Sequence, residues 1–513
     1  VYAIKGTGVC MLASSNVEEA YHMAVVAHLA AVESSLPFVH FFDGFRTSHE
    51  IDKVRLMDEK QVVKLLDKKA VFRFRENAMN SSRPTTRGTA ENEDIYFQHT
   101  EARNIYYDNA VDIIDSVMKK VNYLNGTDYQ PFNYYGDKNA TMVIVAMGSV
   151  TDTIREVVDK LNENDGKYGV VCVHLYRPFS VKHFLSVLPK SVERVAVLDR
   201  AKDATSYGEP LYMDVANVLH DKDIMVVGGR YGLSSKNTTP AQIKSVFDFL
   251  GSRKVHHNFT IGISDDVTHL SLKIDSKFHI EEGEMNLLIY GYGSDGMVST
   301  SKDLIKIIGD NTKNYVQGYF QYDSKKSGGV TRSHIRISGS VIHKPYYVEN
   351  AKVVVISKDN YMYQYDILDN IVYGGILLLN TSLSREDLVR SLPNKVKYLL
   401  AKKNIKFYAI DAYGLVNQLG LRNKISTCME VCIFELIQVL SRKKYLSIMK
   451  NSNEKRFLSK GENVVQANNK VVDMALSVLK EIDVDKKWKN LVYFEDEQLS
   501  DEDVIRYLKG DTL

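Results

Sequence analysis

Short apolar runs alternate with longer amphipathic stretches along this chain, most clearly in its middle part. Helices are expected there at 151–162, 181–188, 211–219 and 241–250. Between them lie β-branched runs of strand length, at 142–147, 169–175, 195–198, 224–227 and 259–263. Strands that alternate with helices in this way form βαβ units, whose parallel sheet is covered by helices on both faces.

The amino-terminal part combines a long apolar helix with polar loops. From Val17 onward, apolar residues occupy most positions of a helical repeat, so we expect a helix that is buried nearly all round. Either Ser15 with Glu18 or Asn16 with Glu19 would form the capping box at its start. The other elements predicted here are a buried strand at 38–42, a helix at 59–79 and a loop at 81–94.

A third pattern of strands and helices begins at about residue 285, after a polar linker. Thr427 and Glu430 have the spacing of a capping box, at the start of a helix predicted over 427–440. The strands predicted in this part lie at 287–290, 315–320, 334–337, 352–357, 376–379 and 405–410.

The fold class that follows is α/β, with three consecutive α/β units and largely parallel sheets. We place the units at residues 1–137, 138–274 and 283–487, followed by an acidic segment at 488–513.

Composition is that of packed soluble domains. The 513 residues are 44% hydrophobic and 25% charged, which is ordinary for a globular chain of about three domains. The 66 Lys and Arg nearly balance the 64 Asp and Glu, so the basic surface of a nucleic-acid-binding protein is not expected. No apolar stretch reaches the roughly 18 residues of a membrane span. Four cysteines do not make a disulfide scaffold and indicate a reducing compartment.

The sharpest local motif is a glycine-rich turn between a strand and a helix. The segment LLIYGYGSDGMVSTSKDLIKII carries Gly291, Gly293 and Gly296 in the spacing GxGxxG. Glycines let the backbone approach a phosphate closely, and the first amides of the following helix attract the anion. The acidic residue that would hold a dinucleotide ribose about 20 positions further on is not evident, which weighs against NAD. A tight turn without a ligand is the alternative.

A loop after the next predicted strand also favours a phosphorylated ligand. In YDSKKSGGVTRSH, the ammonium groups of Lys325 and Lys326 stand between two serines and are followed by two glycines. Such donors suit a phosphate, whereas a solvated charged loop is the alternative. Because the carboxyl ends of parallel strands meet at one edge of the sheet, we expect this loop to converge with the glycine turn.

No group of residues indicates a metal site. Cys428 and Cys432 lie four residues apart on an apolar helix with no histidine nearby, so packing in the core is expected. The histidines lack the spacings of known metal motifs, and no serine stands in a nucleophile elbow.

Longer motifs follow one another over nearly the whole chain. They include FFDGFRTSHE, RPTTRGTAENEDIYFQ, YRPFS, VLDRAK, GEPLYMDV, GGRYGLSSK, IKIIGDNT and QGYFQYDSKKSGGVTRSH. In this order they resemble the pyruvate:ferredoxin (flavodoxin) oxidoreductase family, a branch of the 2-oxoacid:acceptor oxidoreductases.

The resemblance implies a role for each part of the chain. Residues 1–137 would be part of a pyrimidine-type domain for pyruvate and thiamine diphosphate, and 138–274 a transketolase C-terminal-like domain. Residues 283–487 would be a gamma-type domain associated with coenzyme A, and 488–513 the start of a linker domain. Intact members oxidise pyruvate to acetyl-CoA and CO2 with thiamine diphosphate, Mg and 4Fe–4S clusters. Their electrons pass to ferredoxin or flavodoxin, or to NADP in fused forms, in anaerobic energy metabolism.

The resemblance also implies site residues. Coenzyme A would be bound by Gly293, Ser294, Asp295, Gly296, Met297, Val298, Lys325, Lys326, Ser426 and Asn468. The family has Asn at the position of Ser426, and at the position of Lys5 it has an Arg that pairs with the pyruvate carboxylate. Lys5 keeps the charge of that Arg but lacks its bidentate fork.

We interpret the chain as an internal fragment of such an enzyme. It contains no CxxCxxC run, and the start of the first domain, the iron–sulfur domain and the carboxyl-terminal thiamine-diphosphate domain are missing. The fragment alone is expected to be inactive and at most to bind coenzyme A. Its partners would be the remaining domains of the polypeptide, the electron acceptor and a second subunit of a homodimer, in the cytoplasm or in a reducing organelle of an anaerobic eukaryote.

Two other functions stay open at this point. The chain would also suit a non-catalytic subunit or assembly module, or a nucleotide-dependent dehydrogenase built around the glycine turn.

Overall fold

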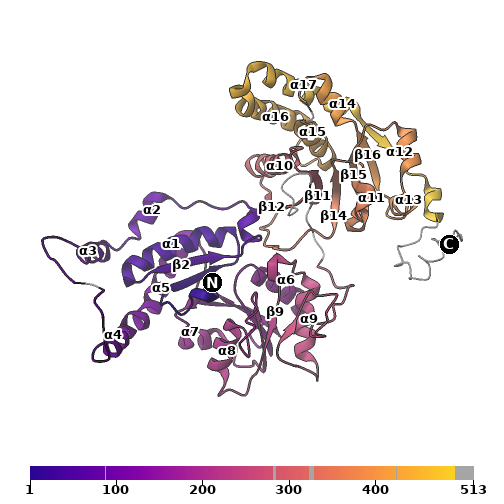
Figure 1. Cartoon of the computed structure of the whole chain (residues 1–513). Helices are drawn as coiled ribbons and strands as arrows, with labels where there is room; N and C mark the ends of the chain where they lie inside the picture. The colour runs from indigo at the N-terminus through magenta and orange to yellow at the C-terminus, as the bar shows by residue number, and fades with distance from the viewer. Residues whose placement is uncertain (87, 281–282, 284, 323–328, 423, 492–513) are drawn as a thin grey trace. The chain divides into compact units, whose positions relative to one another are not determined.

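The chain forms two compact α/β units (Figure 1). The computed structural model describes residues 1–491 except 87, 281–282, 284, 323–328 and 423. Unit 1 comprises the described residues of Val1–Glu281 together with His343–Tyr347, and unit 2 those of Glu282–Ile342 and Val348–Leu513. The sheets are largely parallel in both units, which confirms the predicted fold class. No described helix has the length and hydrophobicity needed to cross a bilayer.

A small sheet with two helices packed on it opens unit 1. The strand order is β2 (Phe38–Phe42), β1 (Cys10–Ser14), β7 (Leu175–Arg177), with β1 parallel to β2 and antiparallel to β7. Helices α1 (Val17–Ser34) and α5 (Asn104–Asn125) enclose an apolar core with β1. Eight of the 18 residues of α1 are buried, nine are half-buried and only His28 is exposed, so the burial predicted on nearly all sides is deep on one face and partial on the other. The sequence analysis did not identify α5, although its buried residues have helical spacing.

Asn16 begins α1. Its side chain accepts a hydrogen bond from the Glu19 amide at 2.9 Å, and the Glu19 carboxylate accepts one from the Ser15 amide at 2.7 Å. Of the two predicted capping boxes, the pair Asn16 and Glu19 is therefore the one that supplies the cap.

Two predictions for this part were wrong. Strand 38–42 exists with the predicted bounds but is only half buried, because β2 is an edge strand and Phe42 is 43% exposed. The helix predicted at 59–79 is divided into α2 (Glu59–Lys64) and α3 (Lys68–Glu76). Asp67 causes the break, because its side chain accepts from the amides of Lys69 and Ala70 and so starts a new helix. The remaining short elements are β3 (Glu50–Ile51) and α4 (Tyr96–Ala102).

The second sheet of unit 1 has six strands. Their order is β10 (Phe259–Thr260), β9 (Met225–Arg230), β8 (Arg194–Asp199), β5 (Met142–Ala146), β6 (Tyr168–Val173) and β4 (Phe132–Gly136). Every pair is parallel except β4 with β6. The helices are α6 (Val150–Asn162), α7 (Val181–Val187), α8 (Pro210–Leu219) and α9 (Pro240–Gly251). Val143 and Val145 of β5 pack into one core and Ile144 and Ala146 into another, so both faces are buried. The strand predicted at 169–175 is divided here between β6 and β7.

Buried polar side chains join the two sheets of unit 1. The Glu19 carboxylate lies 3.5 Å from Nε2 of His174, and the same ring nitrogen lies 3.6 Å from Sγ of Cys172. All three side chains are buried. Burial alone would raise the pKa of Glu19, but His174 and the Ser15 amide lower this pKa to about 2. Burial alone would lower the pKa of His174, but Cys172 and Glu19 hold it well above its usual value.

Unit 2 is built on one mixed sheet. Within this unit the strand order is β17 (Leu479–Ile482), β16 (Lys406–Ile410), β15 (Ile371–Asn380), β14 (Ala351–Ile356), β11 (Met285–Tyr292), β13 (Val330–Ser338) and β12 (Tyr315–Tyr322). The four central strands from β16 to β11 are parallel, whereas β12, β13 and β17 are antiparallel to their neighbours. The helices are α10 (Met297–Asn311), α11 (Tyr361–Gln364), α12 (Arg385–Ser391), α13 (Asn394–Lys402), α14 (Ala412–Gln418), α15 (Ser426–Ile437), α16 (Arg442–Phe457) and α17 (Glu462–Val478).

The predicted capping box of Thr427 and Glu430 does not form. Helix α15 begins one residue earlier than predicted, after Ile425, without a side-chain cap. Thr427 instead donates its hydroxyl to Oδ1 of Asn468 on α17 at 3.0 Å, and Glu430 is buried. A tertiary contact between α15 and α17 therefore takes the place of the local cap.

Candidate functional site

The glycine turn lies at the carboxyl edge of the unit 2 sheet, where the strand order reverses. From β11 the chain passes through α10 to β12 on one side, whereas β14 lies on the other side of β11 and leads to β15. The loops that follow β11 and β14 therefore diverge. The crevice outside such strand ends is the usual ligand site of open α/β sheets.

Asp295 holds the glycine turn in shape. Its carboxylate accepts hydrogen bonds from the amides of Tyr292 at 2.7 Å and of Met297 at 2.8 Å. The side chain is buried, and burial raises its pKa although these amides lower it. Gly296 begins α10 with a left-handed φ of +94° and offers no side-chain cap, and Ser294 also has a positive φ of 83°. Gly293 and Val298 belong to the same turn, which opens α10 with its amide end toward the sheet edge.

Ser426 borders this turn, whereas Asn468 contacts the neighbouring residue Thr427. A Cβ atom on Gly296 would lie 3.1 Å from Cβ of Ser426, and the Thr300 hydroxyl donates to the Ser426 carbonyl at 3.1 Å. Asn468 accepts from Thr427, and its amide nitrogen donates to the Val464 carbonyl at 2.9 Å. Ser426 is thus placed beside the turn, whereas the described contacts of Asn468 support α15.

Lys358 is a cation at this edge that the sequence analysis missed. It follows β14, and its Nζ lies 3.4 Å from the ring centroid of Tyr292 in the glycine turn. An ammonium over an aromatic face is held by the ring quadrupole, so the charge is positioned beside the turn. The sequence feature that could have indicated Lys358 is its position two residues after a buried strand.

The other predicted cations lie elsewhere. Lys325 and Lys326 are outside the described residues. The described chain resumes at Gly329, whose carbonyl accepts a hydrogen bond from the Gly293 amide at 3.1 Å. Lys5 is in unit 1, at the end of a short 3-10 helix (Tyr2–Ile4). Hydrogen bonds from Thr205 and Ser206 lower the pKa of Asp203, and the charge of Lys5 lowers this pKa by a smaller amount.

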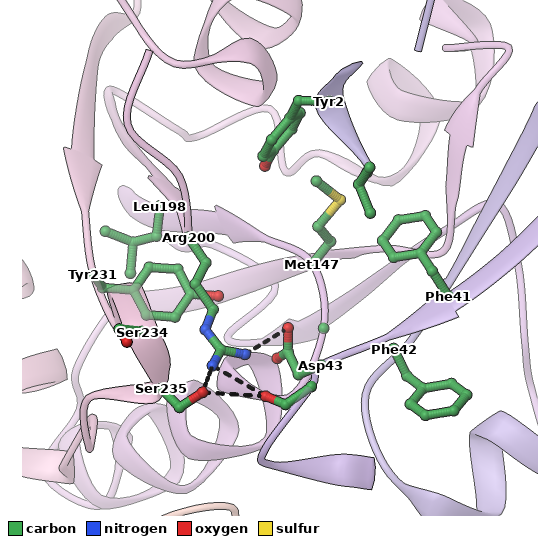
Figure 2. Close-up of a pocket in the computed structure, with 13 residues that line it drawn as sticks. Tyr2, Phe41, Phe42, Asp43, Met147, Leu198, Arg200, Tyr231, Ser234 and Ser235 are labelled. Carbon is green, nitrogen blue, oxygen red and sulfur yellow. Dashed lines mark hydrogen bonds and ion pairs between the residues drawn. The ribbon is translucent and has the colours of Figure 1, made fainter. Parts of the chain in front are cut away.

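Unit 1 contains a second crevice that the sequence analysis did not predict (Figure 2). Its volume is about 350 Å³, and Lys5 is not among the residues that line it. Met147 follows β5 and Arg200 follows β8, and the strand order of the six-stranded sheet reverses between these two strands. Aromatic walls come from Tyr2, Phe41 and Tyr231. This crevice therefore lies where the strand order of the six-stranded sheet reverses, as the glycine turn does on the sheet of unit 2.

An ion pair sits in the wall of this crevice. Arg200 lies 2.9 Å from Oδ1 of Asp43 and donates to the Gly232 carbonyl at 2.9 Å and to the Ser235 hydroxyl at 2.9 Å. The other carboxylate oxygen of Asp43 accepts from the amide and hydroxyl of Ser149, at the start of α6. The start of α6, where a helix can bind an anion, is thus occupied by the Asp43 carboxylate of the protein itself.

The crevice of unit 1 does not fit the diphosphate of thiamine diphosphate, and the described residues do not fit an iron–sulfur cluster. In the crevice, a diphosphate would meet the Asp43 carboxylate, and no described group of three or more His, Cys, Asp or Glu is placed to hold a metal ion. The four cysteines are all buried, and only Cys428 and Cys432 share an element. A cluster with four thiolate ligands has no site among the described residues.

Removal of the Asp43 carboxylate should convert this wall into an anion site. In Asp43→Ala, Arg200 and the Ser149 amide lose a partner, and we expect a loss of about 1–3 kcal/mol in the free energy of unfolding. Inorganic phosphate should restore part of this loss, because it would occupy the same donors. Thermal unfolding with and without phosphate tests this, with Asp203→Ala as an exposed control. An equal response of both variants to phosphate would contradict it.

Comparison with known proteins gives the family. The family model of the thiamine-diphosphate-binding domain of pyruvate flavodoxin/ferredoxin oxidoreductases matches residues 1–119. The model of pyruvate:ferredoxin oxidoreductase core domain II matches 140–243, and the pyruvate ferredoxin/flavodoxin oxidoreductase model matches 286–478. The chain belongs to the pyruvate:ferredoxin (flavodoxin) oxidoreductase family.

Individual members of this family are similar over nearly the whole chain. A pyruvate-flavodoxin oxidoreductase of Enterobacter agglomerans is 42% identical over 99% of this chain and 43% of its own length. A pyruvate:ferredoxin oxidoreductase of Moorella thermoacetica is 44% identical over 96% of this chain and 42% of its own length. The chain thus spans less than half of these relatives. Among solved structures, a pyruvate oxidoreductase subunit of Thermotoga maritima matches with a TM-score of 0.32 and 22% identity, over 39% of this chain and 99% of its own.

Proposed function

We propose that this chain is the coenzyme A-binding part of an enzyme that oxidises pyruvate to acetyl-CoA and CO2. The observation that supports it is the convergence of the glycine turn, Ser426 and Lys358 at the strand-order reversal of unit 2. A coenzyme with several phosphates suits a site that combines backbone amides with an ammonium. The names of the relatives support the reaction.

The residues of this site would have separate tasks. Asp295 uses its carboxylate to shape the turn, which would leave the amides of Val298 and Ser299 to face a phosphate, since the Thr300 amide already donates to the Gly296 carbonyl. Gly293 and Gly296 allow a close approach because they lack a Cβ atom. Lys358 supplies a positive charge, and Lys325 and Lys326 would add two more from the neighbouring loop. Ser426 would offer one hydroxyl, in place of the amide that the family has there.

The remaining chemistry would belong to the intact protein. We propose that it uses thiamine diphosphate with Mg and 4Fe–4S clusters, and that ferredoxin or flavodoxin accepts the electrons. Thiamine diphosphate supplies the electron sink for decarboxylation. Because the crevice of unit 1 does not fit the diphosphate and the described residues do not fit a cluster, these groups would be held by other parts of a homodimer. Lys5 would at most place a charge near the pyruvate carboxylate. The chain alone should then show no pyruvate oxidation.

Titration of coenzyme A by calorimetry tests the proposal. The 513-residue chain should release heat with one site, and dephospho-coenzyme A should bind more weakly if a phosphate is recognised. Lys358→Ala, and the pair Lys325→Ala with Lys326→Ala, should each weaken binding about tenfold, as expected for the loss of a charge-assisted hydrogen bond of about 1.4 kcal/mol or more.

Lys306→Ala is the matched control, because Lys306 lies on α10 but pairs with Asp310 on the exposed side of the helix. It should bind coenzyme A like the unchanged chain. A folded chain that gives no heat with coenzyme A would refute the proposal. Heat with NADH but not with coenzyme A would favour a nucleotide-dependent dehydrogenase instead.

A further inference from the structure

Unit 2 contains a pocket that the coenzyme A site does not use. It lies between α11, together with the short 3-10 helix after it (Ile367–Asn370), and the first half of α13 (Figure 1). Its volume is about 340 Å³, within the range of roughly 300–1,000 Å³ that small-molecule sites occupy. None of the described residues that we assign to coenzyme A lines it. It is therefore a candidate for a second ligand.

The floor of this pocket is apolar. Met362, Ile367, Leu368 and Val396 line it, and each of these side chains is buried. The half-buried ring of Tyr365 adds an aromatic wall. Transfer of an apolar group from water onto such a surface is favourable, because the apolar area of both partners leaves the solvent. The floor therefore suits the aliphatic or aromatic part of a ligand.

One positive and one negative side chain lie at the rim of the pocket. Nζ of Lys395 donates to Oδ1 of Asp366 at 2.7 Å, and both residues line the pocket. The two side chains are 34% and 68% exposed, and an ion pair in contact with water contributes little stability. A ligand can therefore open this pair at small cost. Helix α13 begins beside Lys395 without a side-chain cap, so the first amides of the helix add to the positive side of the rim.

We propose that this pocket binds a free amino acid with an apolar side chain, in its zwitterionic form. The α-carboxylate of the ligand pairs with Lys395, the α-ammonium pairs with Asp366, and the side chain occupies the apolar floor. The ligand carries its two opposite charges close together, as the rim does. Opening of the protein's own ion pair therefore leaves no charge without a partner. The site goes beyond pyruvate oxidation and does not depend on the coenzyme A site.

Other classes of small molecule fit only part of the pocket. An apolar carboxylate without an amine would bring its charge close to Asp366, and an apolar amine without a carboxylate would bring its charge close to Lys395. Each would meet a like charge, which opposes binding. A neutral apolar compound would cover the two rim charges and remove water from them without a new polar contact. The zwitterion is the class that fits the floor and both charges.

Three compounds that share one aromatic ring provide the first test, by saturation-transfer NMR on the folded 513-residue chain. L-Phenylalanine carries both charges, 3-phenylpropanoate lacks the ammonium, and 2-phenylethylamine lacks the carboxylate. L-Phenylalanine should bind with a dissociation constant at least fivefold lower than that of either analogue, and coenzyme A should not displace it. The proposal is overturned by a lack of transfer to L-phenylalanine, by equal affinities of the three compounds, or by displacement with coenzyme A. The heat of coenzyme A binding, measured on the same sample, reports separately on the other site.

Exchange of each rim charge provides the decisive test. Lys395→Met should weaken L-phenylalanine at least fivefold but should not weaken 2-phenylethylamine, because the amine has no carboxylate to lose a partner. Asp366→Asn should weaken L-phenylalanine but not 3-phenylpropanoate, for the opposite reason. Lys397→Met is the matched control, since Lys397 lies on the same helix but does not line the pocket. Both rim side chains are exposed, so circular dichroism should stay unchanged. Equal losses for all three compounds in a rim variant would overturn the assignment of the charges.

Discussion

Replacement of His174 with leucine should lower the free energy of unfolding of unit 1 by about 3–5 kcal/mol. His174 is 1% exposed, and its ring is the cation that faces the buried Glu19 carboxylate at 3.5 Å. Without it, the carboxylate keeps the single hydrogen bond from the Ser15 amide and the more distant charge of Arg155, and it must stay charged in a dry site or take up a proton. Either change costs far more than the packing that leucine supplies.

A matched double variant separates the charge from the packing. When Glu19→Leu is combined with His174→Leu, no unpaired charge remains, and most of the lost stability should return. Glu19→Leu alone also removes the acceptor for the Ser15 amide, so it should be destabilising by itself. Urea unfolding of the three variants measures these differences. Additive losses in the double variant would contradict the pairing of Glu19 with His174.

The same pair predicts how stability depends on pH. The pKa of His174 is held well above 6.5 in the folded chain, so its contribution is complete below about pH 6.5 and is lost as the pH rises through the raised pKa. The pKa of Glu19 is lowered to about 2 from 4.5, so its contribution is present above pH 4.5 and is lost as the pH falls toward 2. Cys172 and Arg155 face the same cluster and stay in the double variant. Wild-type stability should thus fall at alkaline pH, and the double variant should lack most of this fall.

Local patterns were sufficient to predict five strands and the four helices of the six-stranded sheet, but not its edge strand β4. Predicted strand 142–147 and helix 151–162 differ from β5 and α6 by one residue each, because both elements have clear ends and an apolar face set by nearby residues. The glycine turn was found for the same reason. By contrast, Asp43 pairs with Arg200 from more than 150 residues away, and Lys358 meets the turn through strand order. No local spacing records such contacts, so the crevice and Lys358 required the fold.

Gly296→Ala should weaken coenzyme A binding at least tenfold and also lower the stability of unit 2. A left-handed φ costs an alanine about 1–2 kcal/mol, and the new Cβ would lie 3.1 Å from Cβ of Ser426, which is closer than ordinary contact. Relief of this crowding requires α10 to shift against α15, and the turn that faces the phosphate moves with it. Calorimetry and thermal unfolding of the variant measure the two effects.

Gly309 on the same helix is the matched control, and its replacement should have the opposite effect on stability. A Cβ on Gly309 has no atom within 4 Å, and the residue lies inside α10. Gly309→Ala should therefore stabilise by about 0.5–1 kcal/mol, because alanine loses less backbone entropy in a helix, and coenzyme A should bind as before. If Gly296→Ala instead left both the melting temperature and the heat of coenzyme A binding unchanged, the turn would tolerate a Cβ, and it would not be the element that brings the backbone close to a phosphate.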